Sequence, residues 1–291
     1  MAGTGAITFL DGTGFEAFSG DNVPATSAQL IPGWIAAGPA GKVNIADYNR
    51  VRVLTPGITP AITPGGIVPV YSPVSVVQAG SWISIYGTEL ASGTAVWNGD
   101  FPQSLGGASV AIDNKQAYLW FVSPTQINLQ VPDDATTGLV SVAVTTGSGT
   151  ATSTVTLSPY GPSFSLLGDG KHVAGEILTA AGYDLVGPSN TFSYATRPVK
   201  PGETLVLYGV GFGPTSPAVL AGQVYSGSAP TNNKVSITIG GVAANVSYSG
   251  ITEEGLYQFN LTVPNAPSGD QPLQATVNGV QTPAGPVVTI Q

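Results

Sequence analysis

The segment Gln126-Ile127-Asn128-Leu129-Gln130-Val131-Pro132 returns later in the chain as Gln258-Phe259-Asn260-Leu261-Thr262-Val263-Pro264. In both copies polar residues alternate with Ile or Phe, Leu and Val, which is the two-residue period of a strand with one buried and one wet face. A proline closes each copy, as expected where a strand ends. The repeat predicts two units of one β fold, and it contains no catalytic group.

Other landmarks recur around this segment in the same order. Residues 78–87 have a counterpart in 200–209, and residues 106–112 have one in 235–241. Short strands about every 8–12 residues, separated by Gly and Pro turns and without helical periodicity, are typical of immunoglobulin-like β-sandwiches. The sequence therefore predicts an all-β chain with two tandem immunoglobulin-like sandwiches.

The expected boundaries follow from these landmarks. The first sandwich is predicted at residues 68–157, and the second at 158–291, where it begins with an inserted hairpin. The alternating pattern predicts eight inward-pointing side chains, which are Ile83, Ile85, Ile127, Leu129, Leu205, Leu207, Phe259 and Leu261.

The N-terminal residues 1–56 predict a small β-sheet of their own, with strands at 7–10, 34–37, 43–46 and 50–54. Residues 57–67 carry a proline about every four positions, which favours an extended linker. Because a small open sheet leaves strand edges unpaired, the first strand is a candidate for pairing between subunits through Ile7, Thr8, Phe9 and Leu10.

This N-terminal stretch resembles a single NHL-repeat blade of bacterial β-propellers, through residues 18–30 and the hairpin Ile45-Ala46-Asp47…Asn49-Arg50-Val51-Arg52. A propeller needs about 4–8 blades, whereas the chain has one. The stretch is then either an element that pairs with another subunit, the last blade of a longer parent, or a sheet that packs on the next domain.

The remainder resembles the C-terminal module of large acidobacterial secreted proteins, in which each half is similar to a TIG/IPT domain. The resemblance rests on Ser84-Ile85-Tyr86-Gly87-Thr88-Glu89-Leu90, Ser123-Pro124-Thr125-Gln126-Ile127-Asn128 and Gly255-Leu256-Tyr257-Gln258-Phe259-Asn260. It implies an extracellular or cell-surface protein and supplies no catalytic residues.

The composition narrows the partners further. Only 8% of the 291 residues are charged, against roughly 25% in an average protein, and the net charge is -8. The 8 Lys and Arg residues are scattered, so nucleic acid is not expected as a partner. No run approaches the ~20 apolar residues of a membrane-spanning segment, and residues 1–20 lack a signal-peptide pattern, so an exported chain is expected to be mature or partial.

The sequence offers few groups for chemistry. His172 is the only histidine and there is no cysteine, so no catalytic residue, cofactor or metal ligand is predicted, and His172 is expected at the surface or in a turn. An enzyme would need a pocket holding it with two carboxylates. The pairs Asp133-Asp134 and Glu253-Glu254 are expected in solvated turns, with a weak calcium site as the alternative.

Aromatic residues give the remaining site hypothesis. A sugar-stacking platform is one interpretation of these side chains, and core or inter-domain packing is the other: Trp34, Trp82, Trp97, Trp120, Tyr118, Tyr248 and Tyr257. Trp97, beside Asn98-Gly99-Asp100, is the expected glycan contact. The leading functional hypothesis is a non-catalytic extracellular structural protein that assembles with copies of itself, in a filament or another homo-oligomer. The alternative is a polysaccharide-binding adhesion module.

Overall fold

A computed structural model of the protein describes residues 32–38, 42–47, 50–54 and 59–291. These residues form strands, turns and bends without any α-helix, so none of them belongs to a helix able to cross a membrane. The chain divides into two compact units, Met1–Ile58 and Thr59–Gln291. The all-β fold expected from the sequence is confirmed.

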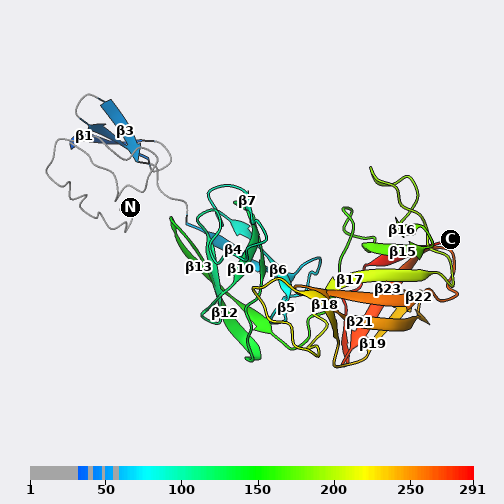
Figure 1. The fold of residues 1–291 in the computed structure, drawn as a ribbon. Coiled ribbons are helices and arrows are strands. Elements are labelled where there is room, and N and C mark those ends of the chain that lie inside the picture. The colour runs from blue at the N-terminus through cyan, green and yellow to red at the C-terminus, as the bar shows by residue number, and fades with distance from the viewer. Residues whose placement is uncertain (1–31, 39–41, 48–49, 55–58) are drawn as a thin grey trace. The chain divides into compact units, whose positions relative to one another are not determined.

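The first unit contains a three-stranded antiparallel sheet (Figure 1). Its strands are β1 (Pro32–Ala37), β2 (Val43–Asp47) and β3 (Arg50–Leu54), in the order β1-β2-β3. Ile45 of the central strand is buried. Three of the four predicted strands are present, whereas the strand predicted at 7–10, with its candidate pairing residues, lies outside the described residues.

The second unit begins with a sandwich of two five-stranded sheets. One sheet has the order β4 (Ala61–Pro69), β6 (Trp82–Thr88), β11 (Gln126–Gln130), β10 (Tyr118–Val122) and β7 (Ala95–Val96). The other has the order β5 (Val76–Val77), β13 (Gly149–Leu157), β12 (Gly138–Thr146), β8 (Ser109–Ile112) and β9 (Lys115–Gln116). Both sheets contribute to one core, in which Ile85 and Leu129 pack with Val142 and Val155.

A second sandwich follows within the same unit (Figure 1). Its larger sheet has the order β16 (Gly182–Leu185), β15 (Gly175–Thr179), β17 (Thr204–Val210), β22 (Leu256–Thr262), β21 (Asn245–Glu253) and β18 (Ser226–Pro230), with β14 (Ser163–Phe164) also on β17. The smaller sheet consists of β20 (Val242–Ala243), β19 (Val235–Ile239), β23 (Gly269–Val277), β24 (Val280–Gln281) and β25 (Val287–Ile290). The hairpin predicted before this sandwich is β15–β16, which extends the larger sheet through β17.

The repeated segment occupies the same place in both sandwiches. In the first it forms β11 and pairs with β6, with Leu129 opposite Ile83. In the second it forms β22 and pairs with β17, with Leu261 opposite Leu205. All eight side chains predicted to point inward are fully buried, and each burial stabilises the fold by about 1.5–3 kcal/mol.

The linker prediction for residues 57–67 is wrong over most of its length. Residues from Ala61 onward form β4, an edge strand that pairs with β6. The register of this pairing shifts between Ile62 and Ile67, and the shifted segment contains Pro64. Because proline is accepted in edge strands and at bulges, the proline spacing did not prevent a strand here.

Candidate functional site

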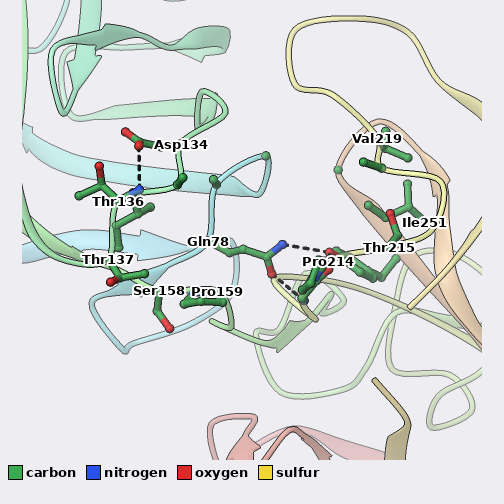
Figure 2. A pocket seen from close by; sticks show the side chains of 18 residues that line it. Gln78, Asp134, Thr136, Thr137, Ser158, Pro159, Pro214, Thr215, Val219 and Ile251 are labelled. Carbon is green, nitrogen blue, oxygen red and sulfur yellow. Dashed lines mark hydrogen bonds between the residues drawn. The ribbon is translucent and has the colours of Figure 1, made fainter. Parts of the chain in front are cut away.

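The two sandwiches of the second unit are joined by the side chain of Gln78. Its Oε1 accepts a hydrogen bond from the Gly213 N–H at 2.7 Å, and its Nε2 donates to the Tyr257 hydroxyl at 3.1 Å. That hydroxyl donates in turn to the Gly213 carbonyl. Burial raises the pKa of Tyr257, so the hydroxyl keeps its proton. Figure 2 shows Gln78 reaching across to this segment of the second sandwich.

A second set of contacts comes from polar residues within the repeated segment and directly after it. Gln130 is buried, donates from Nε2 to the Gly80 carbonyl at 3.0 Å, and accepts the Gly222 N–H at 2.9 Å. Asp133 accepts the Ala221 N–H at 3.1 Å. These groups are satisfied by partners on both sandwiches, so the joint is a specific structural contact.

A cavity of about 280 Å³ opens beside this joint. In Figure 2, Thr136, Thr137 and Ser158 lie on one side of Gln78, and Pro214 and Thr215 of the second sandwich lie on the other. The lining mixes hydroxyl groups with apolar side chains. Its charged side chain, Asp134, is bound by Lys115 and by the Thr136 N–H.

Asp134 lines this cavity and is not in a solvated turn as predicted. Its side chain is 5% exposed, accepts the Thr136 N–H at 2.9 Å, and lies 3.1 Å from Lys115 Nζ. The backbone hydrogen bond from Thr136, together with Lys115, lowers the pKa of Asp134 to about 2. Within the described residues, no group of three or more His, Asp or Glu side chains is arranged to hold a metal ion.

The outer surface of the sheet containing β6 and β10 carries an aromatic cluster. We call it the aromatic face, and it consists of Trp82, Trp97, Phe101, Tyr118 and Trp120. The ring centroid of Trp82 lies 5.6 Å from that of Trp97 and 6.0 Å from that of Trp120, and both ring pairs are in edge-on contact. Such edge-to-face pairs fix each ring in position.

Exposure within the aromatic face differs from the prediction. Trp120 is the most open member at 38% exposed, whereas Trp97, the expected glycan contact, is partly buried against Phe101 at 4.6 Å between ring centroids. Trp120 follows the buried Leu119 on β10, so the alternation of the strand turns its side chain away from the core. Trp97 was expected to be open because it stands beside Asn98-Gly99-Asp100, and its contact with Phe101 is formed only in the fold.

The indole N–H of Trp82 donates to the Glu254 carbonyl of the second sandwich at 2.6 Å. The remaining candidate aromatics lie elsewhere. Trp34 is 85% exposed on β1 of the first unit, Tyr257 is buried at the joint, and Tyr248 lies on β21.

His172 is buried between two carboxylates. Of the two places expected for it, the surface and a turn, the first is wrong. Its Nδ1 lies 2.5 Å from Asp169 Oδ2, and its Nε2 lies 3.1 Å from Asp270 Oδ2. Asp270 has two further partners. Lys171 Nζ lies 2.7 Å from its Oδ2, and the Thr289 hydroxyl donates to its Oδ1 at 2.9 Å. The hydrogen bond from Lys171, followed by those from Thr289 and His172, lowers the pKa of Asp270 to about 2.

These contacts hold the turn before β15 against β23 and β25, which is a structural role. His172 lines neither cavity identified in the described part of the chain. Glu176, the other carboxylate near it in sequence, accepts the Tyr208 hydroxyl at 3.3 Å instead. The arrangement therefore brings two carboxylates, those of Asp169 and Asp270, to the histidine.

Comparison with known proteins supports the class of fold. Residues 66–159 match the IPT/TIG domain, so an immunoglobulin-like domain of this family is present in the first sandwich, and the predicted immunoglobulin-like fold is confirmed. No curated protein sequence matches the chain. The acidobacterial and NHL resemblances remain predictions.

Solved structures similar to the chain have varied roles. The SGBP-B protein of the Bacteroides ovatus mixed-linkage glucan utilization locus, solved with a mixed-linkage heptasaccharide, is 11% identical with a TM-score of 0.34, covering 86% of this chain and 52% of that one. Domains 5-6 of the S-layer protein SbsC are 14% identical with a TM-score of 0.28, covering 80% and 99%. Gamma-CGTase from alkalophilic Bacillus clarkii is 12% identical with a TM-score of 0.26, covering 88% and 30%.

The chain thus spans about half the length of the Bacteroides ovatus protein. These structures include a glycan-binding protein, a surface-layer protein and an enzyme, and likeness at these TM-scores does not assign one of those roles to the chain.

Proposed function

We propose that the protein is a non-catalytic extracellular binding protein that holds neutral polysaccharide on the aromatic face of its first sandwich. The observation that carries the proposal is the cluster of Trp82, Trp97 and Trp120, in which Trp120 is held edge-on by its neighbour and remains open to solvent.

The chemistry of this surface fits a sugar. Rings of Trp offer broad apolar surfaces to the C–H faces of a pyranose, and a few polar groups fix its orientation. The adjacent strand β11 supplies two of these from its outward positions. Gln126 Nε2 donates to Asn128 Oδ1 at 2.8 Å, which orients both carboxamides.

The charge of the surface fits a neutral ligand. Only 8% of the residues are charged and the net charge is -8, so a polyanion is not matched. Hydroxyl groups of a neutral polysaccharide can donate to and accept from such amides without the cost of desolvating an ion.

The test is retention on insoluble cellulose, chitin, starch and mixed-linkage glucan, measured for the full chain. We expect wild-type protein to be retained by at least one of these, and Trp120→Ala to weaken retention about 10-fold or more, because interface tryptophans commonly contribute about 2 kcal/mol or more. Trp34→Ala is the matched control, since it removes an exposed tryptophan from the first unit. Equal retention of wild type and Trp120→Ala would refute the proposal.

A second candidate function is assembly with copies of the same chain, favoured by the sheet of the first unit. Trp34 and Ile35 on β1 and Val51 on β3 are largely exposed, and apolar side chains on a small open sheet invite pairing with another chain. Sedimentation velocity and electron microscopy test it. Oligomers or filaments that disappear in Val51→Asp would support assembly, whereas monomers at high concentration would contradict it.

A further inference from the structure

A loop of the second sandwich lies directly against the aromatic face. We call residues 219–225 the joint loop. Gly222 in this loop has φ +76°, and a Cβ there would lie 2.2 Å from the Tyr118 ring. The backbone therefore passes flat against that ring, and only glycine permits the approach. Tyr118 is itself in edge-on contact with Phe101, at 6.4 Å between ring centroids.

Side chains of both sandwiches fix the position of the joint loop. The Gly222 N–H is bound by Gln130, the Ala221 N–H is bound by Asp133, and the Tyr225 N–H lies 3.4 Å from Glu254 Oε2. The carbonyl of Glu254 also accepts the Trp82 indole N–H. The joint loop and the rings of the aromatic face are thus held by one connected set of hydrogen bonds.

The joint loop also presents apolar side chains to solvent. Leu220 is 55% exposed and Val224 is 72% exposed, on either side of the glycine that touches Tyr118. Neither side chain packs into the core of its own sandwich. Exposed apolar residues next to an aromatic surface enlarge the apolar area against which a ligand can pack and lose its hydration water.

We infer that the joint loop is the second wall of the polysaccharide site, so that the site spans both sandwiches and favours an extended neutral glycan chain over a single sugar. The inference rests on the proposed function. Tyr118, which Gly222 of the joint loop approaches, and Trp120 lie two residues apart on β10, so an extended chain can contact both walls.

The test uses Leu220→Asp and Val224→Asp, singly and together, in the full chain. The probe is the polysaccharide that retains wild-type protein most strongly, together with its monosaccharide and hexasaccharide as soluble competitors. We expect the double variant to be retained about 10-fold less, and the hexasaccharide to compete at far lower concentration than the monosaccharide. Leu139→Asp is the matched control, because Leu139 is 72% exposed on β12 of the opposite sheet.

The outcomes separate this inference from the proposed function. Loss of retention in both Trp120→Ala and the double variant, with unchanged melting temperatures, supports a site with two walls. Loss in Trp120→Ala alone overturns the second wall and leaves the aromatic face as the site. Wild-type retention in both variants overturns the polysaccharide site itself, and equal competition by monosaccharide and hexasaccharide overturns the preference for an extended chain.

Discussion

Replacing Gln78 by alanine should weaken the joint between the sandwiches by an amount that calorimetry can measure. The substitution leaves the buried Gly213 N–H without its acceptor, and an unsatisfied buried donor costs about 1–3 kcal/mol. It also removes the donor to the Tyr257 hydroxyl, a net loss of about 0.5–1.5 kcal/mol. Because Gln78 lines a cavity that water can enter, we expect the lower part of this range, about 2 kcal/mol in total.

That loss corresponds to a fall in melting temperature of about 4–8 °C for a unit of this size. Scanning calorimetry should also show the two sandwiches of Gln78→Ala unfolding in separate transitions. Gln78→Glu should also be less stable than wild type, since its carboxylate can still accept the Gly213 N–H but cannot donate to the Tyr257 hydroxyl, whose own proton is donated to the Gly213 carbonyl. Gln103→Ala, at an exposed glutamine, is the control. A melting temperature within 1 °C of wild type for Gln78→Ala would refute this account of the joint.

Three further changes test other parts of the fold. Phe259→Ala should lower the free energy of unfolding by about 3–5 kcal/mol in urea titration, because it empties a fully buried site in the second core. Gly211→Ala should destabilise strongly in a thermal melt, since Gly211 has φ +79° and a Cβ would lie 2.0 Å from the Gly161 carbonyl oxygen. The lowered pKa of Asp134 contributes stability above pH about 4, and this stability is lost as the pH falls toward 2. In an acid titration, Asp134→Asn should therefore lose less stability over that range than wild type. An acid profile equal to that of wild type would contradict the role of Lys115 and Thr136.

The core of each sandwich was predictable because it depends on a pattern that a strand repeats every two residues. Leu129 and Leu261 alternate with polar neighbours, so their inward direction follows from the strand period alone. The strand β4 was not predictable in the same way. Its prolines argue for a linker when taken in sequence order, and only pairing with β6 shows that they lie in an edge strand with a register shift.

The joint and the exposed tryptophan depend on contacts between distant segments. Gln130 looks like any outward polar residue of a strand, and its buried contact with Gly222 appears only when the second sandwich is in place. Trp97 was chosen over Trp120 because it stands beside a turn in the sequence, and its packing against Phe101 appears only in the folded chain. The alternation of residues specifies which face a side chain occupies, but not which part of the chain covers that face.

The two copies nevertheless contain a signal for the joint, at positions where they differ. Gln130 lies opposite Trp82, and the equivalent pair in the second sandwich is Thr262 opposite Thr204. The first pair contacts the neighbouring sandwich through its polar atoms, and the small threonines lack the carboxamide and the indole N–H that make those contacts. The position equivalent to Gln78 is likewise a lysine, Lys200.

At the equivalent positions, the second sandwich therefore does not reproduce the groups by which the first sandwich binds it. Copies of the chain that assembled end to end through a repeat of this joint would have to replace the bonds of Gln78, Gln130 and Trp82 with those of a lysine and two threonines. The self-assembly proposed above is therefore expected on a different surface, the exposed apolar side chains of the first unit, which include Trp34 and Val51. The proposed polysaccharide binding by the second unit and the proposed assembly through the first unit are thus expected to be separable, and substitutions in one unit should change one property without affecting the other.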